Sequence, residues 1–141
     1  MQLTNKETLR HVQENFKDNF GRLVGYHITG ITADTCEYIF EATENHFNPL
    51  GILHGGSLFS VMDSSQGALL WTVVDQKKFF IVVAQSSIRY KKQHKTGTIT
   101  VKTKIADHKR NIYYMQSMAF SNNNELLATL DQKWFISPKF Q

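Results

Sequence analysis

Residues 57–75 constrain the fold more than any other segment, because apolar side chains recur around almost the whole circumference of one helix there. The apolar positions are Leu58, Phe59, Val61, Met62, Ala68, Leu69, Leu70, Trp71, Val73 and Val74. A helix that is apolar on every side is buried rather than laid on a surface. The chain must therefore supply a partner large enough to enclose this helix.

Most of the remaining chain predicts strands that would enclose the helix. Apolar and polar residues alternate after residue 23, which predicts two strands joined by a turn at Ala33-Asp34. Four further strands are predicted over residues 79–90, 98–105, 112–120 and 126–136. Hairpin signals separate the last three of these, at residues 107–111 and 122–124. An antiparallel sheet curved around one apolar helix accommodates these elements with a single core.

The N-terminal segment predicts one more helix. Leu9, Val12 and Phe16 recur at three- and four-residue intervals, which gives a single buried stripe. Thr4 and Glu7 match a capping box, with Thr4 as the N-cap. The expected fold class is α+β, with an N-terminal helix, a long central helix and an antiparallel sheet in one domain spanning residues 1–141.

The composition excludes several classes of protein. Hydrophobic residues make up 41% of the chain, far too many for a disordered one. The single cysteine, Cys36, rules out an internal disulfide, and no histidine pair has the H-x-x-x-H spacing, so we expect no metal. The chain starts without a basic region followed by an apolar run, and its longest uncharged stretch, residues 45–62, contains Pro49. We expect neither a secretory signal nor a membrane span, and a cytoplasmic location.

The segment before the central helix is the first candidate for chemistry. It reads Asn48-Pro49-Leu50-Gly51-Ile52-Leu53-His54-Gly55-Gly56. Two glycines at the start of a helix leave backbone N–H groups unpaired and unshielded, and the helix dipole adds positive potential there. Such N–H groups suit a carbonyl oxygen that becomes an oxyanion. The alternative is that the glycines only allow the helix to begin close to a strand.

Asp63 is the second candidate, because it lies about two turns inside the most apolar helix of the chain. Burying a carboxylate is costly unless it has a partner or a task. A desolvated Asp beside a reactive centre can act as a general base or a nucleophile. The alternative is that Asp63 belongs to one polar stripe with Ser65 and Gln66, or is bonded to a neighbouring strand.

The spacing of the two candidates has a consequence for assembly. Gly55 and Asp63 are eight residues apart, which is roughly 12 Å along one helix. An Asp side chain cannot span that distance to a carbonyl held at Gly55. If both groups act on one substrate, Asp63 must come from a second copy of the chain, packed antiparallel about a two-fold axis. The chemistry would then require a homodimer.

Basic residues are concentrated in one part of the sequence, on two strands that we predict to be adjacent and on their turns. Eight lie between positions 89 and 110, namely Arg89, Lys91, Lys92, Lys95, Lys102, Lys104, Lys109 and Arg110. Such a cluster would attract a polyanionic ligand. The alternative is a solvated sheet edge guarded by lysines. Nucleic acid fits less well, because the net charge is only +4 and no recognition helix is predicted.

The pattern Asn48-x-x-Gly51-x-x-His54-Gly55-Gly56, followed by Asp63 on the central helix, resembles the hotdog-fold acyl-CoA thioesterases that include the phenylacetate-pathway enzymes. The segment Ser87-Ile88-Arg89-Tyr90 resembles the strand that follows the helix in that family. The order and lengths of the expected elements agree over nearly the whole chain. The resemblance implies a hotdog fold, homodimers that often pair into homotetramers, and hydrolysis of acyl-CoA thioesters without a cofactor beyond the CoA of the substrate.

The resemblance also implies roles for the matching residues. Asp63 would be the general base or nucleophile, and the N–H of Gly55, with that of Gly56, would polarise the thioester carbonyl. Asn48 would position the carbonyl or the water, and His54 would shape the loop. The nucleotide end of CoA would lie near Tyr90, Lys91, Lys92, Lys109 and Arg110. The acyl group would lie among the apolar side chains of Phe59, Met62, Leu69 and Phe80.

One position departs from the family pattern and keeps other functions open. Related enzymes often carry Ser or Thr on the strand after the helix, near the catalytic water, and here that position is Val83, with Ser86 and Ser87 further along. A non-catalytic acyl-CoA binding or sensing module is therefore one alternative. A hotdog enoyl-CoA hydratase, in which Asp and His act together on the substrate's α and β carbons, is another. Neither a nucleic acid nor a membrane is an expected partner.

Overall fold

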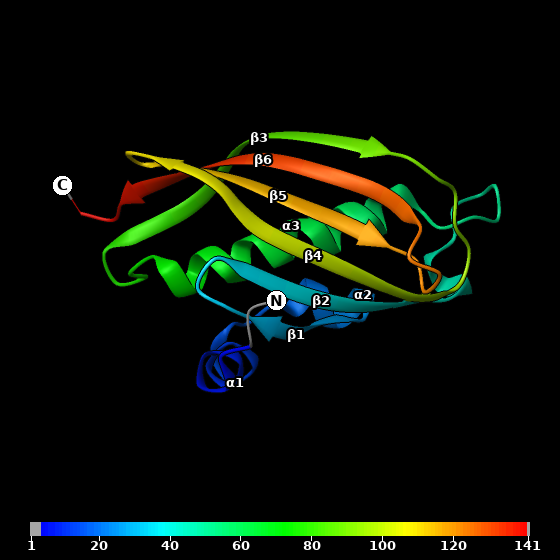
Figure 1. Ribbon diagram of the computed structural model, residues 1–141, viewed down its shortest axis with the longest axis horizontal. Helices are drawn as coiled ribbons and strands as arrows, with labels where there is room; N and C mark the ends of the chain where they lie inside the picture. The colour runs from blue at the N-terminus through cyan, green and yellow to red at the C-terminus, as the bar shows by residue number, and fades with distance from the viewer. Residues whose placement is uncertain (1–3, 141) are drawn as a thin grey trace.

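The computed structural model describes residues 4–140, which form one curved sheet around a long helix (Figure 1). In chain order the elements are α1 (Lys6–Asn15), α2 (Asn19–Val24), β1 (Tyr26–Ile31), β2 (Thr35–Ala42), the 3-10 turn η1 (Glu44–His46), α3 (Gly55–Val73), β3 (Phe79–Tyr90), β4 (Gly97–Lys109), β5 (Ile112–Phe120) and β6 (Leu126–Pro138). The expected α+β class, with an antiparallel sheet, a central helix and an N-terminal helix, is confirmed.

The sheet encloses α3 as the apolar sequence of that helix predicts. Met62, Leu69 and Leu70 on α3 have no exposed surface, and they belong to one core with Phe40 of β2 and Ile99 of β4. Burial of a Leu or Met side chain contributes about 1.5–3 kcal/mol relative to leaving it in water. The sheet curves around this helix along its whole length (Figure 1). Enclosure of α3 by the sheet therefore contributes to the fold's hydrophobic stabilisation.

The strands follow the order β1-β2-β4-β5-β6-β3 across the sheet, and every neighbouring pair is antiparallel. β3 pairs only with β6, so the prediction that β3 and β4 are adjacent is wrong. β3 therefore forms one edge of the sheet, and most of its residues are exposed, including Phe80 (53%), Val82 (47%) and Val83 (38%). A long apolar edge strand whose outer backbone groups have no partner strand can pair with another chain.

A β-bulge at Ala84 changes which β3 residues face the helix. Val83 lies opposite Trp134, and Ser86 lies opposite Gln132, with one extra residue between them compared with regular alternation. Both partners on β6 are buried. The bulge thus places Val83 and Ser86 on the same face of the sheet, toward α3.

The N-terminal region differs from the prediction in two respects. The N-cap of α1 is Asn5, whose side chain accepts a hydrogen bond from the Thr8 N–H (3.0 Å), and Thr4 does not take this place. Residues 19–24, which alternation assigned partly to a strand, form α2. Asp18 caps the start of α2 through the Gly21 N–H (2.9 Å), and Gly25, at a φ of 102°, ends it.

The remaining boundaries differ from the prediction by a few residues. α3 begins at Gly55 rather than residue 57 and ends at Val73 rather than residue 75, while β4 and β6 extend to Lys109 and Pro138. The turn between β4 and β5 is consequently tight, and Arg110 adopts a positive φ of 57° there. In the part of the chain that the structure describes, no helix is long and apolar enough to cross a membrane.

Candidate active site

A cavity of about 470 Å³ lies at the N-terminal end of α3. The loop before the helix and the segment after β3 meet there, and the Leu53 N–H donates to the His94 carbonyl (2.8 Å). The cavity is lined by Asn48, Ile52, Leu53, His54, Gly55, Gly56, Leu58, Tyr90, Lys91, Lys92, Gln93 and His94. Seven of the residues that the sequence marked as catalytic or CoA-binding are therefore together in one place.

His54 caps α3 and decides which glycine N–H remains available. Its Nδ1 accepts a hydrogen bond from the Gly56 N–H (2.8 Å), and its carbonyl accepts one from the Ser57 N–H (3.0 Å). Because a backbone N–H is a single donor, the Gly56 N–H is already engaged. The Gly55 N–H has no acceptor among residues 4–140. Of the two glycines, Gly55 alone thus presents an unengaged donor at the helix start.

Tyr90 packs directly on Gly55 and explains why this position has no side chain. The Tyr90 hydroxyl donates to the Gly55 carbonyl (3.0 Å), and a Cβ at position 55 would lie 2.8 Å from the Tyr90 ring. Partial burial raises the pKa of the Tyr90 phenol above its ordinary value, so the hydroxyl remains a donor at neutral pH. Close packing of helix and strand is therefore sufficient to require Gly55, whatever its chemistry.

Asn48 is engaged in holding the loop before α3. Its side-chain oxygen accepts hydrogen bonds from the N–H groups of Leu50 (2.9 Å) and Ile52 (3.4 Å). This is the local side-chain-to-backbone bonding that Asn commonly supplies in turns. The oxygen of Asn48 is therefore occupied, and the amide nitrogen is the group that it can offer to a ligand.

Asp63 lies further along α3, outside this cavity, and is half-buried. Its Oδ1 accepts a hydrogen bond from Nε2 of Gln132 on β6 (3.0 Å). Desolvation raises the pKa of the Asp63 carboxyl, the Gln132 hydrogen bond lowers that pKa, and the negative charge of Asp18 raises it further. The net pKa lies above the ordinary value, which suits a carboxylate that accepts a proton.

Asp63 is bonded to a neighbouring strand and Gln66 shares its network, as the alternative interpretation of Asp63 predicted. The sequence did not single out Gln132 or Ser86 as the other members of this network. Gln132 Nε2 also donates to Gln66 Oε1 (2.9 Å), and Ser86 Oγ donates to Gln132 Oε1 (2.5 Å). A signal for Gln132 was present, since it occupies an inward position of β6 between the buried apolar residues Leu130 and Trp134. No sequence signal marks the bulge that brings Ser86 opposite it.

Two of the predicted CoA-binding residues lie far from the cavity within one chain. Lys109 and Arg110 are at the turn between β4 and β5, whereas Lys91 and Lys92 follow β3, and the two groups lie at opposite ends of the molecule (Figure 1). The cause is the length of β4, because its 13 residues carry the chain from the region of Lys91 and Lys92 to the far end of the sheet. Lys92 forms an exposed ion pair with Glu125 (2.7 Å).

The four residues predicted to line an acyl pocket do not gather around one cavity in the single chain. Met62 and Leu69 have no exposed surface and are part of the core. Phe59 is half-buried. Phe80 is on the outer face of β3, and its ring lies 5.0 Å from the Lys139 ammonium nitrogen.

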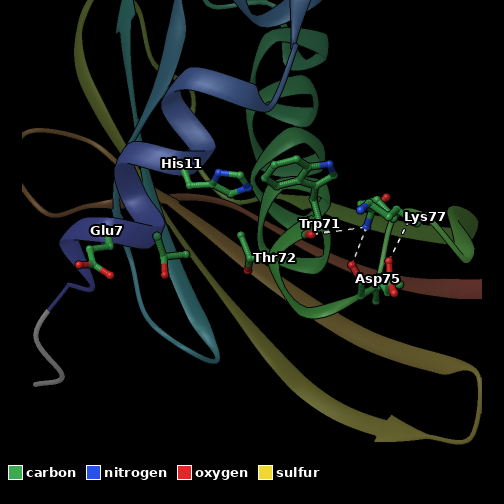
Figure 2. Close-up of a pocket in the computed structure, with 9 residues that line it drawn as sticks. Glu7, His11, Trp71, Thr72, Asp75 and Lys77 are labelled. Carbon is green, nitrogen blue, oxygen red and sulfur yellow. Dashed lines mark hydrogen bonds between the residues drawn. The ribbon is translucent and has the colours of Figure 1, made fainter.

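A second cavity, of about 530 Å³, lies between α1 and the end of α3 (Figure 2). The His11 and Trp71 rings stack there with centroids 5.2 Å apart, and Asp75 accepts the Lys77 N–H (2.9 Å). These polar and aromatic groups are engaged with one another. Among residues 4–140, no group of three or more His, Cys, Asp or Glu side chains is arranged to hold a metal ion.

Comparison with known proteins gives one family and a set of similar folds. Residues 50–128 match the family model described as the thioesterase superfamily. Among curated proteins, none matches the sequence. A thioesterase from Haemophilus influenzae has a similar structure, at 16% identity and a TM-score of 0.85, covering 100% of this chain and 98% of that one.

Two further structures are similar over most of their length. The PaaI protein from the phenylacetic acid degradation operon of E. coli is 16% identical with a TM-score of 0.77, covering 92% of this chain and 91% of that one. A thioesterase mutant from Pseudomonas aeruginosa is 16% identical with a TM-score of 0.83, covering 97% and 96%. At such identities the similarity establishes a shared hotdog fold.

Proposed function

Because this chain belongs to the thioesterase superfamily and has the hotdog fold, we propose that it hydrolyses an acyl-CoA thioester to a free acid and CoA. One observation carries the proposal. α3 presents the unengaged N–H of Gly55 at its start and the half-buried carboxylate of Asp63 two turns later. An oxyanion donor and a base of raised pKa are the two groups that acyl transfer to water needs.

The proposed site is completed by a second copy of the chain. Gly55 and Asp63 are on one helix, about 12 Å apart along its axis, and cannot reach the same carbonyl carbon. A two-fold axis that sets two α3 helices antiparallel would bring Asp63 of the partner subunit to the Gly55 N–H, giving two equivalent sites. The exposed edge strand β3, with Val82 on its surface, supports such an assembly, since edge pairing would extend the sheet across both chains.

In this arrangement the thioester oxygen accepts the Gly55 N–H at the positive end of the α3 dipole. Asp63 takes a proton from water as the water oxygen bonds to the thioester carbon. The tetrahedral adduct then collapses, the C–S bond breaks, and the sulfur of CoA leaves with the proton. Direct attack by Asp63, followed by hydrolysis of the resulting anhydride, gives the same products.

The CoA end of the substrate would lie along the cavity lined by Tyr90, Lys91 and Lys92. Both lysines are exposed, so phosphate oxygens can reach their ammonium groups, with Lys92 exchanging Glu125 for a phosphate. Lys109 and Arg110 take part only if the partner subunit brings its β4–β5 turn to this cavity. Of the four residues predicted to line the acyl pocket, half-buried Phe59 on α3 is the one that we propose contacts the acyl group.

A non-catalytic acyl-CoA binding module is the second candidate, and Val83 favours it. This residue faces α3, at the position where the family resemblance implies a Ser or Thr hydroxyl. Thiol release from acyl-CoA distinguishes a thioesterase from both alternatives. A binding module would retain acyl-CoA without releasing thiol, and a hydratase would act on an enoyl-CoA without releasing thiol.

The test is thiol release from short, medium, long and aromatic acyl-CoAs by the wild type, Asp63→Asn and Asp131→Asn. Asp131 is an exposed carboxylate on the outer face of β6 and is the matched control. We expect Asp63→Asn to lower kcat by about 100-fold or more with an unchanged fold, and Asp131→Asn to match the wild type. Equal turnover by wild type and Asp63→Asn would rule out a catalytic role for Asp63. Acyl-CoA binding without thiol release by the wild type would establish the binding module instead.

A further inference from the structure

The carboxylate of Asp63 is held by one oxygen only. Oδ1 accepts the Gln132 amide N–H at 3.0 Å, and Oδ2 accepts no hydrogen bond from residues 4–140. Gln132 is itself 3% exposed and lies on β6, which is paired on both sides, with β5 and with β3. A buried amide on a paired strand is a well-fixed donor, because its backbone cannot shift without breaking strand pairing on both sides.

The orientation of the Gln132 amide follows from two groups, one of which can only donate a hydrogen bond and one of which can only accept one. An indole N–H only donates, so the Gln66 atom that receives the Trp134 Nε1–H (2.9 Å) must be its oxygen. A backbone carbonyl only accepts, so the Gln66 atom facing the Leu130 carbonyl (3.2 Å) must be its nitrogen. Both ends of the Gln66 amide are therefore fixed.

That constraint passes from Gln66 to Gln132. The Gln66 oxygen accepts a second hydrogen bond, from the Gln132 amide at 2.9 Å, so the Gln132 group that faces it must be the NH2. The second hydrogen of this NH2 points to Asp63, and the Gln132 oxygen accepts the Ser86 hydroxyl. A flipped Gln132 would set two oxygens against each other at Gln66 and again at Asp63. The network therefore always presents a donor to Asp63.

We propose that Gln132 is a positioning residue for Asp63, oriented by Trp134 through Gln66, and that it holds Oδ1 so that Oδ2 is aimed at the reacting water or thioester. Gln132 takes this part in catalysis only if Asp63 acts as set out under the proposed function. Ser86 anchors the far side of the same amide from β3, at the position that the Ala84 bulge turns inward. The edge strand and the central helix thus meet at one side chain of β6.

A neutral amide that donates to a carboxylate favours its charged form, so Gln132 opposes the effect of burial on Asp63. The other titratable group that acts on Asp63 is Asp18, on the turn before α2. Tyr26 of β1, whose hydroxyl is bonded to Ser64 (2.6 Å), is also near, and its pKa is raised mainly by burial and in part by the charge of Asp63. The network side chains that β3 and β6 contribute, Ser86 and Gln132, are uncharged. Without Gln132, desolvation and the charge of Asp18 raise the Asp63 pKa, and the hydrogen bond that lowers it is lost.

The experiment compares Gln132→Met with Gln116→Met. Met has nearly the length of Gln and no hydrogen-bonding amide, and Gln116 donates to Asp131 (3.2 Å) on the exposed face of the same sheet. The first readout is the Asp63 carboxyl pKa by carbon-13 NMR titration, with Asp63→Asn used for assignment. We expect Gln132→Met to raise this pKa by about one unit and Gln116→Met to leave it unchanged. Trp134→Phe, which removes the orienting N–H, should raise it by less.

The second readout is turnover. We expect Gln132→Met to lower kcat by about 10- to 100-fold with little change in KM, because a misdirected base is lost from the chemical step. An unchanged Asp63 pKa in both Gln132→Met and Trp134→Phe would overturn the assignment, and so would a raised pKa with wild-type kcat. If Gln132→Met fails to fold, Trp134→Phe decides the question alone. Absence of thioester hydrolysis by the wild type would instead count against the proposed function, since the titration does not depend on turnover.

Discussion

At the scale of single residues, Asp63 shows how a proposed reactive group affects stability. Its carboxyl is half-buried beside Gln132, and desolvation with the nearby charge of Asp18 keeps its pKa above the ordinary value. A raised pKa means that the folded protein binds the Asp63 proton more tightly than the unfolded chain does. Ionisation of Asp63 therefore lowers the free energy of unfolding as the pH rises.

This linkage gives a prediction for Asp63→Asn. Asn keeps an oxygen for the Gln132 amide and carries no charge. Below about pH 3.9, the pKa of an unfolded Asp, wild type and variant should differ by a constant amount. From there up through the raised folded pKa, the wild type should lose stability relative to the variant, and the difference should level off above it. Urea unfolding at pH 3.5 to 8 measures the two free energies of unfolding. The prediction is contradicted if the value for Asp63→Asn minus the value for the wild type falls as the pH rises.

At the scale of elements, the contact between the start of α3 and the end of β3 shapes the proposed site. Tyr90 bonds to the Gly55 carbonyl and fills the space that a side chain at position 55 would need. His54 occupies the Gly56 N–H in the same turn. One capping side chain and one aromatic ring thus leave a single backbone donor for a substrate.

The Gly55–Tyr90 contact predicts strong coupling in a double-mutant cycle. Gly55→Ala alone should lower the free energy of unfolding by about 1–3 kcal/mol, because the new Cβ meets the Tyr90 ring at 2.8 Å. In a Tyr90→Ala background the same change should be neutral, or stabilising by up to about 1 kcal/mol, since Ala favours helix over Gly. Chemical denaturation of the four proteins gives the interaction free energy. Equal costs of Gly55→Ala in both backgrounds would rule out the steric explanation.

The elements also show where prediction from sequence succeeds and where it stops. β3 and β5 begin and end at the predicted residues, because runs of β-branched and aromatic residues are bounded by clear turns. α2 was missed because Val24 fits an alternating pattern with Tyr26 and Ile28, although Asp18 and Gly25, which cap the two ends of α2, favoured a helix. Hydrophobic patterning specifies which residues are inside, but it carries little information on which strands pair or where a bulge falls.

At the scale of the whole molecule, a single chain does not bring all the candidate catalytic groups together. Asn48, His54, Gly55 and Tyr90 surround one cavity, and Asp63 lies outside it on the same helix. The motif was enough to group Asn48, His54 and Gly55, and the family resemblance added Tyr90 as a CoA-binding residue. The inward position of Gln132 could be read from the alternation of β6, but its bond to Asp63 could not, because the network joins α3, β3 and β6, which are far apart in the sequence.

Assembly through β3 gives the prediction at this scale. Val82 is 47% exposed on the edge strand, and a Glu there would place a charge in the edge that pairing of two chains would cover. We expect Val82→Glu to shift the protein from dimer toward monomer in light scattering and to lower turnover in parallel. Leu23→Glu, at an 85% exposed position on α2, is the control. A dimeric Val82→Glu with wild-type turnover would contradict assembly through this edge.

The pairing of β3 with β6 also sets an order of events during synthesis. β3 emerges well before β6, the last of the described strands, and its first residue, Phe79, pairs with Pro138 of β6. Until β6 leaves the ribosome, β3 has backbone groups open on both sides and an apolar sequence, which is the kind of segment that aggregates. Completion of the sheet is thus necessarily late, and chaperone demand should be greatest for chains that have made β5 and lack β6.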